Sequence, residues 1–376
     1  MSDGAIQANG GTVAVTSGSF TGSAGKTLGF GGNVSLDSNS NISAPLGTAN
    51  FLNGTITIDG AYTAGATKLT GGTVGWNGSG TIGVGDLTVT NGIGNFNGAA
   101  NVGTLSQTGG AANFNGATSL VRGALSAGTL GGTGTATLNG PLAWNGGMIG
   151  TSTVGGQPGT LVISPGVTVT IAVGASGIFL YGETLENHGT IAFGGSGGTW
   201  YLGNATTIDN FGLIDLQNDL PLSQQTSPPA LIDNTGTFQK SVGTLESAVG
   251  VTLNNSGSVI VQTGKLSLIG GGTNSGSFHG ASGTTLSFSG SSSAQTFTVS
   301  SSVSNSLGTV NFTFGSPTLA GTYDAGITNL SGGNADRRQR RYFHRCHTGI
   351  GVPARRDAQQ PGDFSLDWDQ SDLSWE

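Results

Sequence analysis

The sequence predicts an all-β protein built as a solenoid, in which short strands wind into stacked coils. Three observations support this: the composition, a short internal repeat, and strand-like alternation within each repeat. Of the 376 residues, 71 are glycine and 8% are charged, while 35% are hydrophobic. Such a composition fits either flexible low-complexity coil or a turn-rich β protein. Disorder usually combines low hydrophobicity with high net charge, and the net charge here is only −7, so we expect an ordered β protein.

The short repeat has a period of roughly twenty residues, which is typical of solenoids with strands and Gly/Asn corners. NFNGA occurs at 95–99 and again at 113–117, and WNG occurs at 76–78 and 144–146. A triplet of Gly, Thr and an aliphatic or aromatic residue recurs at 54–56, 72–74, 103–105, 128–130, 159–161, 189–191, 236–238, 243–245 and 308–310.

Between these corners, short runs alternate apolar and polar side chains, as in TITID (55–59), LTVT (87–90) and SVIVQ (258–262). One coil cannot bury its few apolar groups, but coils stacked about 4.8 Å apart form a continuous core. Asn-Gly pairs tolerate the positive φ angles of corners, and they also fit the hairpin turns of an antiparallel sandwich. They occur at 53–54, 77–78, 91–92, 97–98, 115–116, 139–140 and 145–146. Because the runs are short for a sandwich and helical periodicity is absent, we favour a solenoid of about 15 coils.

A long repeat is superimposed on the short one. Residues 17–32 match 275–290, and residues 46–72 match 307–333, while the offset changes from 258 to 261 residues. We therefore expect residues 1–336 to form the solenoid, with one full unit of about 260 residues and the start of a second, 17–72 matching 275–333.

The last forty residues, 337–376, differ in composition from the rest of the chain. The segment NADRRQRRYFHRCHTG (334–349) contains five arginines, two histidines and the only cysteine. An arginine-rich arm for nucleic acid and a metal cluster of His344, Cys346 and His347 are both conceivable, but a fourth ligand for zinc is missing and acidic residues follow the arginines. Translation one nucleotide later permits residues typical of the solenoid, so we interpret 337–376 as an irregular tail translated out of frame.

Five stretches of the sequence resemble repeats of one known family of proteins. These stretches are LAWNGGMIGTSTV (142–154), LENHGTIAF (185–193), WYLGNATTIDNFGLIDLQ (200–217), LIDNTGTFQKSVGT (231–244) and LNNSGSVIVQTGKLSLIGGGTNSGSF (253–278). The chain resembles the bacterial surface β-helix repeats of adhesin-like, haemagglutinin-like and autotransporter-passenger proteins. The resemblance implies a right-handed parallel β-helix, an extracellular or cell-surface location, and a structural or adhesive function without catalysis. The partners it implies are host or matrix surface glycans or proteins, and it implies no catalytic, cofactor-binding or metal-binding residue.

The chain has no apolar stretch of the roughly 20 residues that would span a bilayer, so we expect it not to cross a membrane. Its start, MSDGAIQANGG, lacks the features of a secretory signal, which leads us to expect a piece of a longer protein. A single cysteine excludes an internal disulfide framework. We expect neither nucleic acid nor a defined small molecule as a partner.

The alternative function is a carbohydrate-active enzyme, because the parallel β-helix also carries polysaccharide lyases and hydrolases. Glycosidic cleavage needs two carboxyl groups close together, one of them with a raised pKa. The candidate acid and base groups are Glu183, Glu186, His188, Asp209, Asp215, Asp219 and Asp233. Asp215 and Asp233 could meet on one face, although solvated corner residues are the more typical interpretation. Trp76, Trp144 and Trp200 could stack on sugars, but tryptophan among glycine-rich coils more often fills the core.

Overall fold

The computed structural model describes residues 4–152, 158–174, 177–289, 295–313 and 318–331. These residues form 36 strands and no helix, and about 65% of them lie in strands. The strands pair in parallel with the strands of the neighbouring coil, as β5 (Thr55–Ile58) does with β7 (Thr73–Trp76). Parallel pairing between coils excludes the hairpin interpretation and confirms the predicted β-solenoid.

The chain divides into two compact units, which together make about 14 turns. Unit 1 comprises the described residues of Met1–Ile214 and Gln224–Ala230, and unit 2 comprises those of Asp215–Ser223 and Leu231–Glu376. Two strands contain residues of both ranges, namely β22 (Leu213–Leu216) and β23 (Leu222–Gln224).

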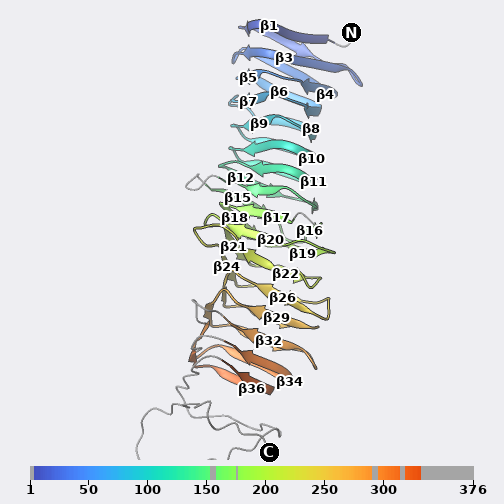
Figure 1. The fold of residues 1–376 in the computed structure, drawn as a ribbon. Helices are drawn as coiled ribbons and strands as arrows, with labels where there is room; N and C mark the ends of the chain where they lie inside the picture. The colour runs from blue at the N-terminus through green and yellow to red at the C-terminus, as the bar shows by residue number, and fades with distance from the viewer. Residues whose placement is uncertain (1–3, 153–157, 175–176, 290–294, 314–317, 332–376) are drawn as a thin grey trace, which may run out of the picture. The chain divides into compact units, whose positions relative to one another are not determined.

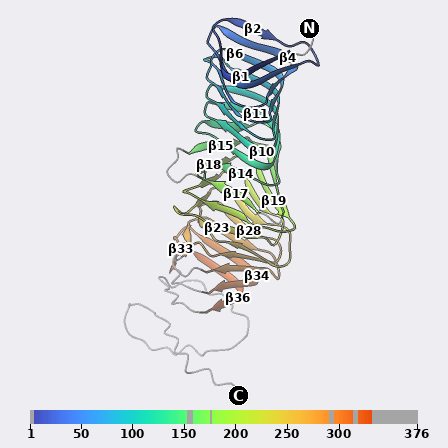
Figure 2. The ribbon, with the colours of Figure 1, turned by 45° about the horizontal axis from the view of Figure 1, so that its top comes forward.

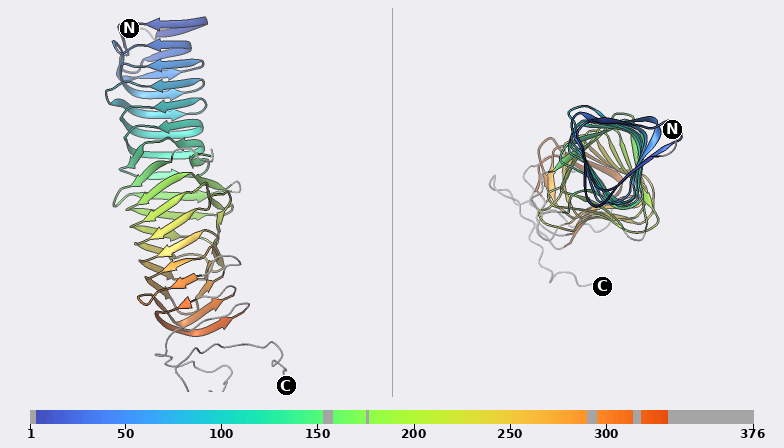
Figure 3. Two further views of the ribbon diagram at one scale, coloured as in Figure 1. Left: turned by 90° about the vertical axis from the view of Figure 1, so that its left-hand side faces the viewer. Right: turned by 90° about the horizontal axis from the view of Figure 1, so that it is seen from above.

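In unit 1 the strands lie in three columns, each running along the stack of coils (Figure 1). The first column contains β2 (Gly18–Thr21), β4 (Ser40–Phe51), β6 (Ala61–Leu69), β8 (Ile82–Val89), β10 (Ala100–Phe114), β11 (Thr118–Gly131), β12 (Thr135–Leu138), β15 (Gly159–Ile163), β18 (Glu183–Asn187) and β21 (Thr207–Asn210). The long strands of this column continue around a corner, and the second column is then extended by β13 (Leu142–Trp144), β16 (Thr168–Val173) and β19 (Thr190–Gly195). The third column contains the second halves of β1 (Gly4–Val15) and β3 (Thr27–Leu36), followed by β5, β7, β9 (Ile93–Phe96), the last residues of β10 and β11, β14 (Met148–Gly150), β17 (Ile178–Tyr181) and β20 (Trp200–Gly203). Seen along the stack, the coils of unit 1 follow nearly the same outline (Figure 3).

Unit 2 repeats this three-column arrangement with shorter strands. Its first column contains β24 (Leu231–Asn234), β27 (Thr252–Asn255), β30 (Gly272–Asn274), β33 (Gln295–Phe297) and β35 (Thr318–Leu319). Its second column contains β25 (Thr237–Lys240), β28 (Ser258–Val261), β31 (Ser277–Gly280), β34 (Ser302–Phe312) and β36 (Thr322–Leu330), several of which are visible in Figure 2. Its third column contains β26 (Glu246–Val249), β29 (Lys265–Leu268) and β32 (Thr285–Phe288), and it continues in the second halves of β34 and β36.

The core consists of rows of inward side chains, one from each coil. Because the coils pair in register, equivalent residues lie directly on one another, and aromatic rings stack along the axis. The Trp76 and Phe96 rings are 4.4 Å apart at 10°, and Phe96 and Phe114 follow at 5.1 Å. Stacked rings of this kind add stabilisation beyond the area they bury.

The two copies of the long sequence repeat have equivalent local structure. Tyr62 and Thr67 share a hydrogen bond between their hydroxyl groups at 2.6 Å, and Tyr323 and Thr328 share the same bond at 2.7 Å. Strands β6 and β36, which carry these pairs, have bounds that differ by the repeat offset at both ends. The predicted tail, 337–376, with His344, Cys346 and His347, lies outside the described residues.

Candidate functional site

The seven acid and base candidates do not converge on one place. Glu186 and His188 are 3.8 Å apart, and both side chains are more than one-third exposed. The His188 ring stacks on Phe211 at 4.7 Å and 6°, and Asp209 lies in register with Glu186 on the adjacent coil. These groups lie on the open outer surface of unit 1, so water screens their charges.

Asp215 and Asp233 belong to different columns of unit 2, so the structure does not place them opposite one another. Asp215 lies in β22, which pairs with β25, whereas Asp233 lies in β24, which pairs with β27. Asp215 is buried and its Oδ2 accepts a hydrogen bond of 2.8 Å from the Gln217 amide. The Oδ1 of Asp233 accepts a hydrogen bond of 2.8 Å from Asn254. The suggestion that these two carboxylates meet on one face of the solenoid is therefore wrong.

Glu183 is the candidate with the most unusual environment. It is 6% exposed at the start of β18, and burial raises the pKa of its carboxyl to about 8, although a hydrogen bond from the Gly159 N–H works in the opposite direction. Its Oε2 has no hydrogen-bond partner among the described residues. A raised pKa suits a general acid, but no neighbouring charge contributes to this shift, so it does not indicate a carboxylate pair.

The three tryptophans fill the core, as the sequence indicated. Trp76, Trp144 and Trp200 are each no more than 1% exposed. They are therefore not available to stack on a sugar.

The densest polar cluster of unit 2 surrounds a lysine that the sequence analysis did not single out. In β25, Phe238 and Lys240 point inward, and both are fully buried. Lys240 lies in register with Val261 of the next coil, so an ammonium occupies an inward position that Val261 fills with an aliphatic side chain. The inward direction of Lys240 could have been predicted from the alternation in TFQK (237–240), because residues two apart in a strand, such as Phe238 and Lys240, point to the same side.

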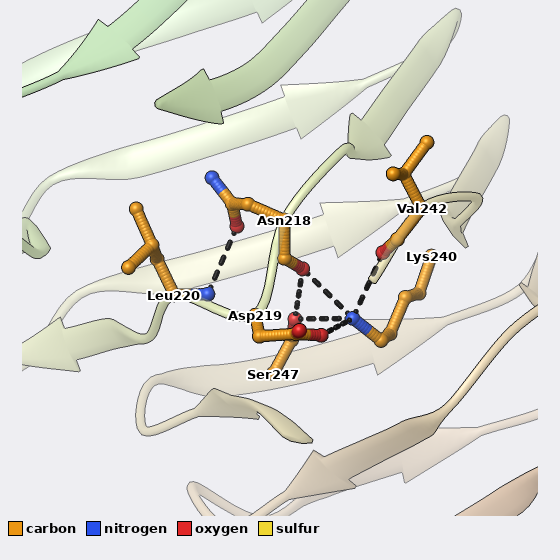
Figure 4. A network of polar contacts seen from close by, with 6 residues as sticks. All are labelled: Asn218, Asp219, Leu220, Lys240, Val242 and Ser247. Carbon is orange, nitrogen blue, oxygen red and sulfur yellow. Dashed lines mark hydrogen bonds and ion pairs between the residues drawn. The ribbon is translucent and has the colours of Figure 1, made fainter. Parts of the chain in front are cut away.

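Four oxygens surround the Lys240 ammonium (Figure 4). Its Nζ donates to the carbonyl oxygen of Asn218 at 2.7 Å, to Asp219 Oδ1 at 2.6 Å, to the carbonyl oxygen of Val242 at 3.0 Å and to Ser247 Oγ at 3.1 Å. An ammonium has three protons, so two of these oxygens share one of them. The Ser247 hydroxyl in turn donates to the carbonyl oxygen of Asn218 at 2.8 Å.

Asp219 completes the cluster as an ionised carboxylate. Partial burial opposes its ionisation, but hydrogen bonds from Lys240 and from the N–H groups of Leu245 and Thr244, with the lysine charge, leave its pKa below the usual value. The backbone of Gly243 passes so close that a Cβ there would lie 2.2 Å from Asp219 Oδ1, and its φ is +92°. Glycine is therefore the residue that this corner accommodates.

The cluster contains the elements of a serine–lysine dyad, but its geometry is unsuited to catalysis. A nucleophilic serine needs a neighbouring base and access for substrate. The Lys240 Nζ is already engaged by Asp219 and three further oxygens, and neither Lys240 nor Ser247 is exposed. The arrangement instead ties the loops 217–221 and 241–245 to the core of unit 2.

Buried asparagines form a second structural device, which explains a recurring N-x-G motif in the sequence. Asn187 donates to Asn210 Oδ1 at 2.7 Å in unit 1, and Asn234 donates to Asn255 Oδ1 at 2.7 Å in unit 2. Asn274, in register with Asn255, donates to Gln295 at 2.8 Å. These side chains replace the aliphatic residues that hold the same inward position in other coils, such as Ile163. Most of these amides bond to one another and to the backbone of the corner, while Asn274 Oδ1 and Gln295 Nε2 have no partner among the described residues. Their contacts within the core indicate a role in packing.

The described residues contain no group of three or more His, Cys, Asp and Glu side chains arranged to hold a metal ion. They also contain no helix of the length and apolar character that spanning a bilayer requires. Unit 1 also has a shallow open groove, and none of the residues that line it carries a carboxylate. They are Thr104, Leu105, Ser106, Arg122, Gly123, Ala124, Pro141, Leu142, Ala143 and Thr170.

The fold and the two polar devices define a class of protein, the parallel β-solenoid, with a core built from stacked aliphatic, aromatic and amide rows. Comparison with known proteins adds no family to this class: no family model, no curated protein and no solved structure matches the chain.

Proposed function

We propose that the chain is a structural and adhesive segment of a large bacterial extracellular or cell-surface protein, and that it has no catalytic activity. The observation that carries the proposal is the use of polar side chains in this fold. They are stacked on one another between coils or locked into the core, rather than gathered around a cavity.

The outer surface of unit 1 illustrates this use. At one corner, Asn77 donates to Asp59 at 2.9 Å, Asn97 donates to Asn77 at 2.6 Å, and Asn115 donates to Asn97 at 2.7 Å. The Thr133 N–H ends this outer ladder with a hydrogen bond of 3.1 Å to Asn115 Oδ1. Such a ladder stiffens successive coils while leaving a regular polar surface, which suits a stalk or display surface.

The repeat structure supports the proposal in a second way. A solenoid grows by adding coils, and each coil contacts only its neighbours. The equivalent strands β6 and β36 show that a similar coil sequence is used twice in this chain. We propose host or matrix surface glycans or proteins as the partners of the display surface.

Adhesion is tested with the purified full chain coupled to fluorescent beads, which are applied to immobilised matrix proteins and to an array of surface glycans. The proposal predicts saturable binding to at least one of these surfaces, above that of beads carrying an unrelated soluble protein. Binding no higher than that control on every surface would count against an adhesive role and leave only the structural one.

A carbohydrate-active enzyme remains the second candidate because of Glu183, which among the seven candidate acid and base groups combines burial with a pKa raised to about 8. The test is depolymerisation of acidic and neutral polysaccharides, followed by new reducing ends and by ultraviolet absorbance of unsaturated products. Activity that disappears in Glu183→Gln, with unchanged circular dichroism, would establish the enzyme and overturn the proposal of a non-catalytic segment.

A further inference from the structure

We propose that Asn91 and Asn145 are sites of spontaneous deamidation in the folded protein, and that the asparagines of the outer ladder are protected from the same reaction. The proposal does not depend on the function proposed above. The sequence has eight Asn-Gly pairs, and the proposal starts from the seven that follow Asn9-Gly10, all of which lie at described corners of unit 1.

The chemistry needs only water. The backbone nitrogen of the glycine loses its proton and attacks the side-chain Cγ of the preceding asparagine. The new N–C bond closes a succinimide ring, and the amide nitrogen takes up a proton and leaves as ammonia. Water then adds to one of the two ring carbonyls, and the C–N bond that breaks decides whether aspartate or isoaspartate forms. Glycine at the second position favours the attack because it has no side chain to hinder it.

The reaction requires that the carboxamide rotate freely toward the next backbone nitrogen, and hydrogen bonds oppose this rotation. In the outer ladder both ends of each amide are held. Asn97 donates to Asn77 and accepts from Asn115, and Asn115 accepts from the Thr133 N–H. The Gly116 nitrogen, which would attack Asn115, donates to the carbonyl oxygen of Phe96 at 3.1 Å. Attack there must first break several hydrogen bonds.

Two further Asn-Gly pairs are held by other contacts. Asn139 donates to Ser119 Oγ at 2.9 Å and accepts from Ser164 Oγ at 3.3 Å. Asn53 is held at one end, where its Oδ1 accepts from the Gly32 N–H at 2.7 Å. Asn53 should therefore react at an intermediate rate.

Asn91 and Asn145 differ because of the residues that the neighbouring coils place beside them. Gly71 and Gly109 hold the corner position of Asn91 on the two adjacent coils, and neither has a side chain to bind the amide. Asn145 follows Trp144, and its own N–H pairs with Leu125, which sets it beside Ser126. Both asparagines are exposed, and within the described part of the chain neither side chain makes a hydrogen bond.

The attacking nitrogens at these two corners are also free of backbone pairing. Among the described residues, the N–H groups of Gly92 and Gly146 donate no backbone hydrogen bond. Among the described residues, the ladder glycines Gly78 and Gly98 also donate no backbone hydrogen bond, and Asn77 and Asn97 are exposed as well. The free amide is therefore what distinguishes Asn91 and Asn145 from these two ladder positions. The ladder thus protects the corners where an isoaspartate, with its longer main chain, would disturb stacking in several coils.

The test is prolonged incubation of the full chain at mildly alkaline pH, followed by peptide mapping and mass spectrometry of the seven corner pairs. A parallel sample in concentrated denaturant reports the intrinsic rate of each pair without the fold. In the folded sample we expect Asn91 and Asn145 to deamidate at least roughly tenfold faster than Asn77, Asn97 and Asn115, because two hydrogen bonds hold each of these. In the denatured sample the rates should become similar.

The variant Asn115→Ala isolates the effect of the ladder, since it removes the donor to Asn97 without changing the Asn97-Gly98 pair. Deamidation at Asn97 should rise several-fold, while that at Asn91 and Asn145 should not change. Ladder asparagines that react as fast as Asn91 and Asn145 in the folded chain would overturn the proposal, and so would an unchanged Asn97 rate in a variant with unaltered circular dichroism.

Discussion

Replacement of the buried lysine by methionine, Lys240→Met, tests the central polar cluster of unit 2. Methionine keeps the length and the apolar stem, and it removes the ammonium from among four oxygens. The carbonyl of Val242 then loses its side-chain donor, whereas Asn218 keeps the Ser247 hydroxyl. The loss of stability then depends on how far water and the remaining N–H and O–H donors can replace the hydrogen bonds of the lysine.

Removal of one partner from a buried ion pair costs about 3–5 kcal/mol. The lower end applies here because the Asp219 side chain is 27% exposed and still accepts from the N–H groups of Leu245 and Thr244. The apolar methionine side chain can also pack beside Val261 of the next coil. We therefore expect Lys240→Met to lower the free energy of unfolding by about 3 kcal/mol.

The matched control is Lys265→Met, which makes the same chemical change in an exposed ion pair. Lys265 and Glu246 are 3.0 Å apart, with side chains 36% and 44% exposed, so the loss there should be about 0–1 kcal/mol. Denaturant unfolding gives the midpoints, and hydrogen exchange of the loops 217–221 and 241–245 localises the effect. If Lys240→Met costs no more than Lys265→Met, or leaves exchange in both loops unchanged, the reasoning about the cluster is wrong.

The same pair makes stability depend on pH in a defined direction. The pKa of Asp219 is lower in the folded protein than in the unfolded chain, where it is about 3.9. Its contribution is therefore fully present above the unfolded pKa and is lost as the pH falls through the folded pKa. Unfolding curves recorded across the acidic range should show a smaller dependence in Lys240→Met than in the parent chain.

Three further predictions follow from the polar groups. The raised pKa of about 8 means that Glu183 ionises in the unfolded chain before it does in the folded protein, so the parent chain should lose stability as the pH rises from about 4.5 to 8. Glu183→Gln should lose less stability over this range, and identical stability–pH profiles for the variant and the parent would contradict the prediction. Asn234→Ala should lower the free energy of unfolding by about 1–3 kcal/mol, since it leaves the Asn255 amide oxygen without its donor, and denaturant unfolding would refute this by showing no change. Gly243→Ala should cost about 1–3 kcal/mol, because a positive φ and the Asp219 carboxylate both oppose a Cβ; a thermal midpoint equal to that of the parent would exclude this close approach.

The sequence by itself determined the class of fold, because the physical causes of a solenoid are local. The alternation of short runs such as TITID decides which side chains point inward, and Gly and Asn corners recur at a spacing that suits stacked coils. The placement of Trp76 in the core follows from the same alternation, and the structure confirms it at 1% exposure. The length of about 14 turns is also close to the prediction from the repeat period.

The tertiary structure decided which polar residues meet, since that depends on register between coils about twenty residues apart. The N-x-G motif is visible in the sequence, yet the amide contact between Asn234 and Asn255 exists only because β24 and β27 pair in register. Likewise, the inward direction of Lys240 follows from alternation, but its oxygens come from Asn218, Asp219, Val242 and Ser247 on three separate segments. An alternating pattern predicts on which side of the strand a side chain lies, but it does not predict which residues will contact it. For the same reason, the free amide of Asn91 and the held amide of Asn97 look alike in the sequence and differ only through the residues stacked beside them.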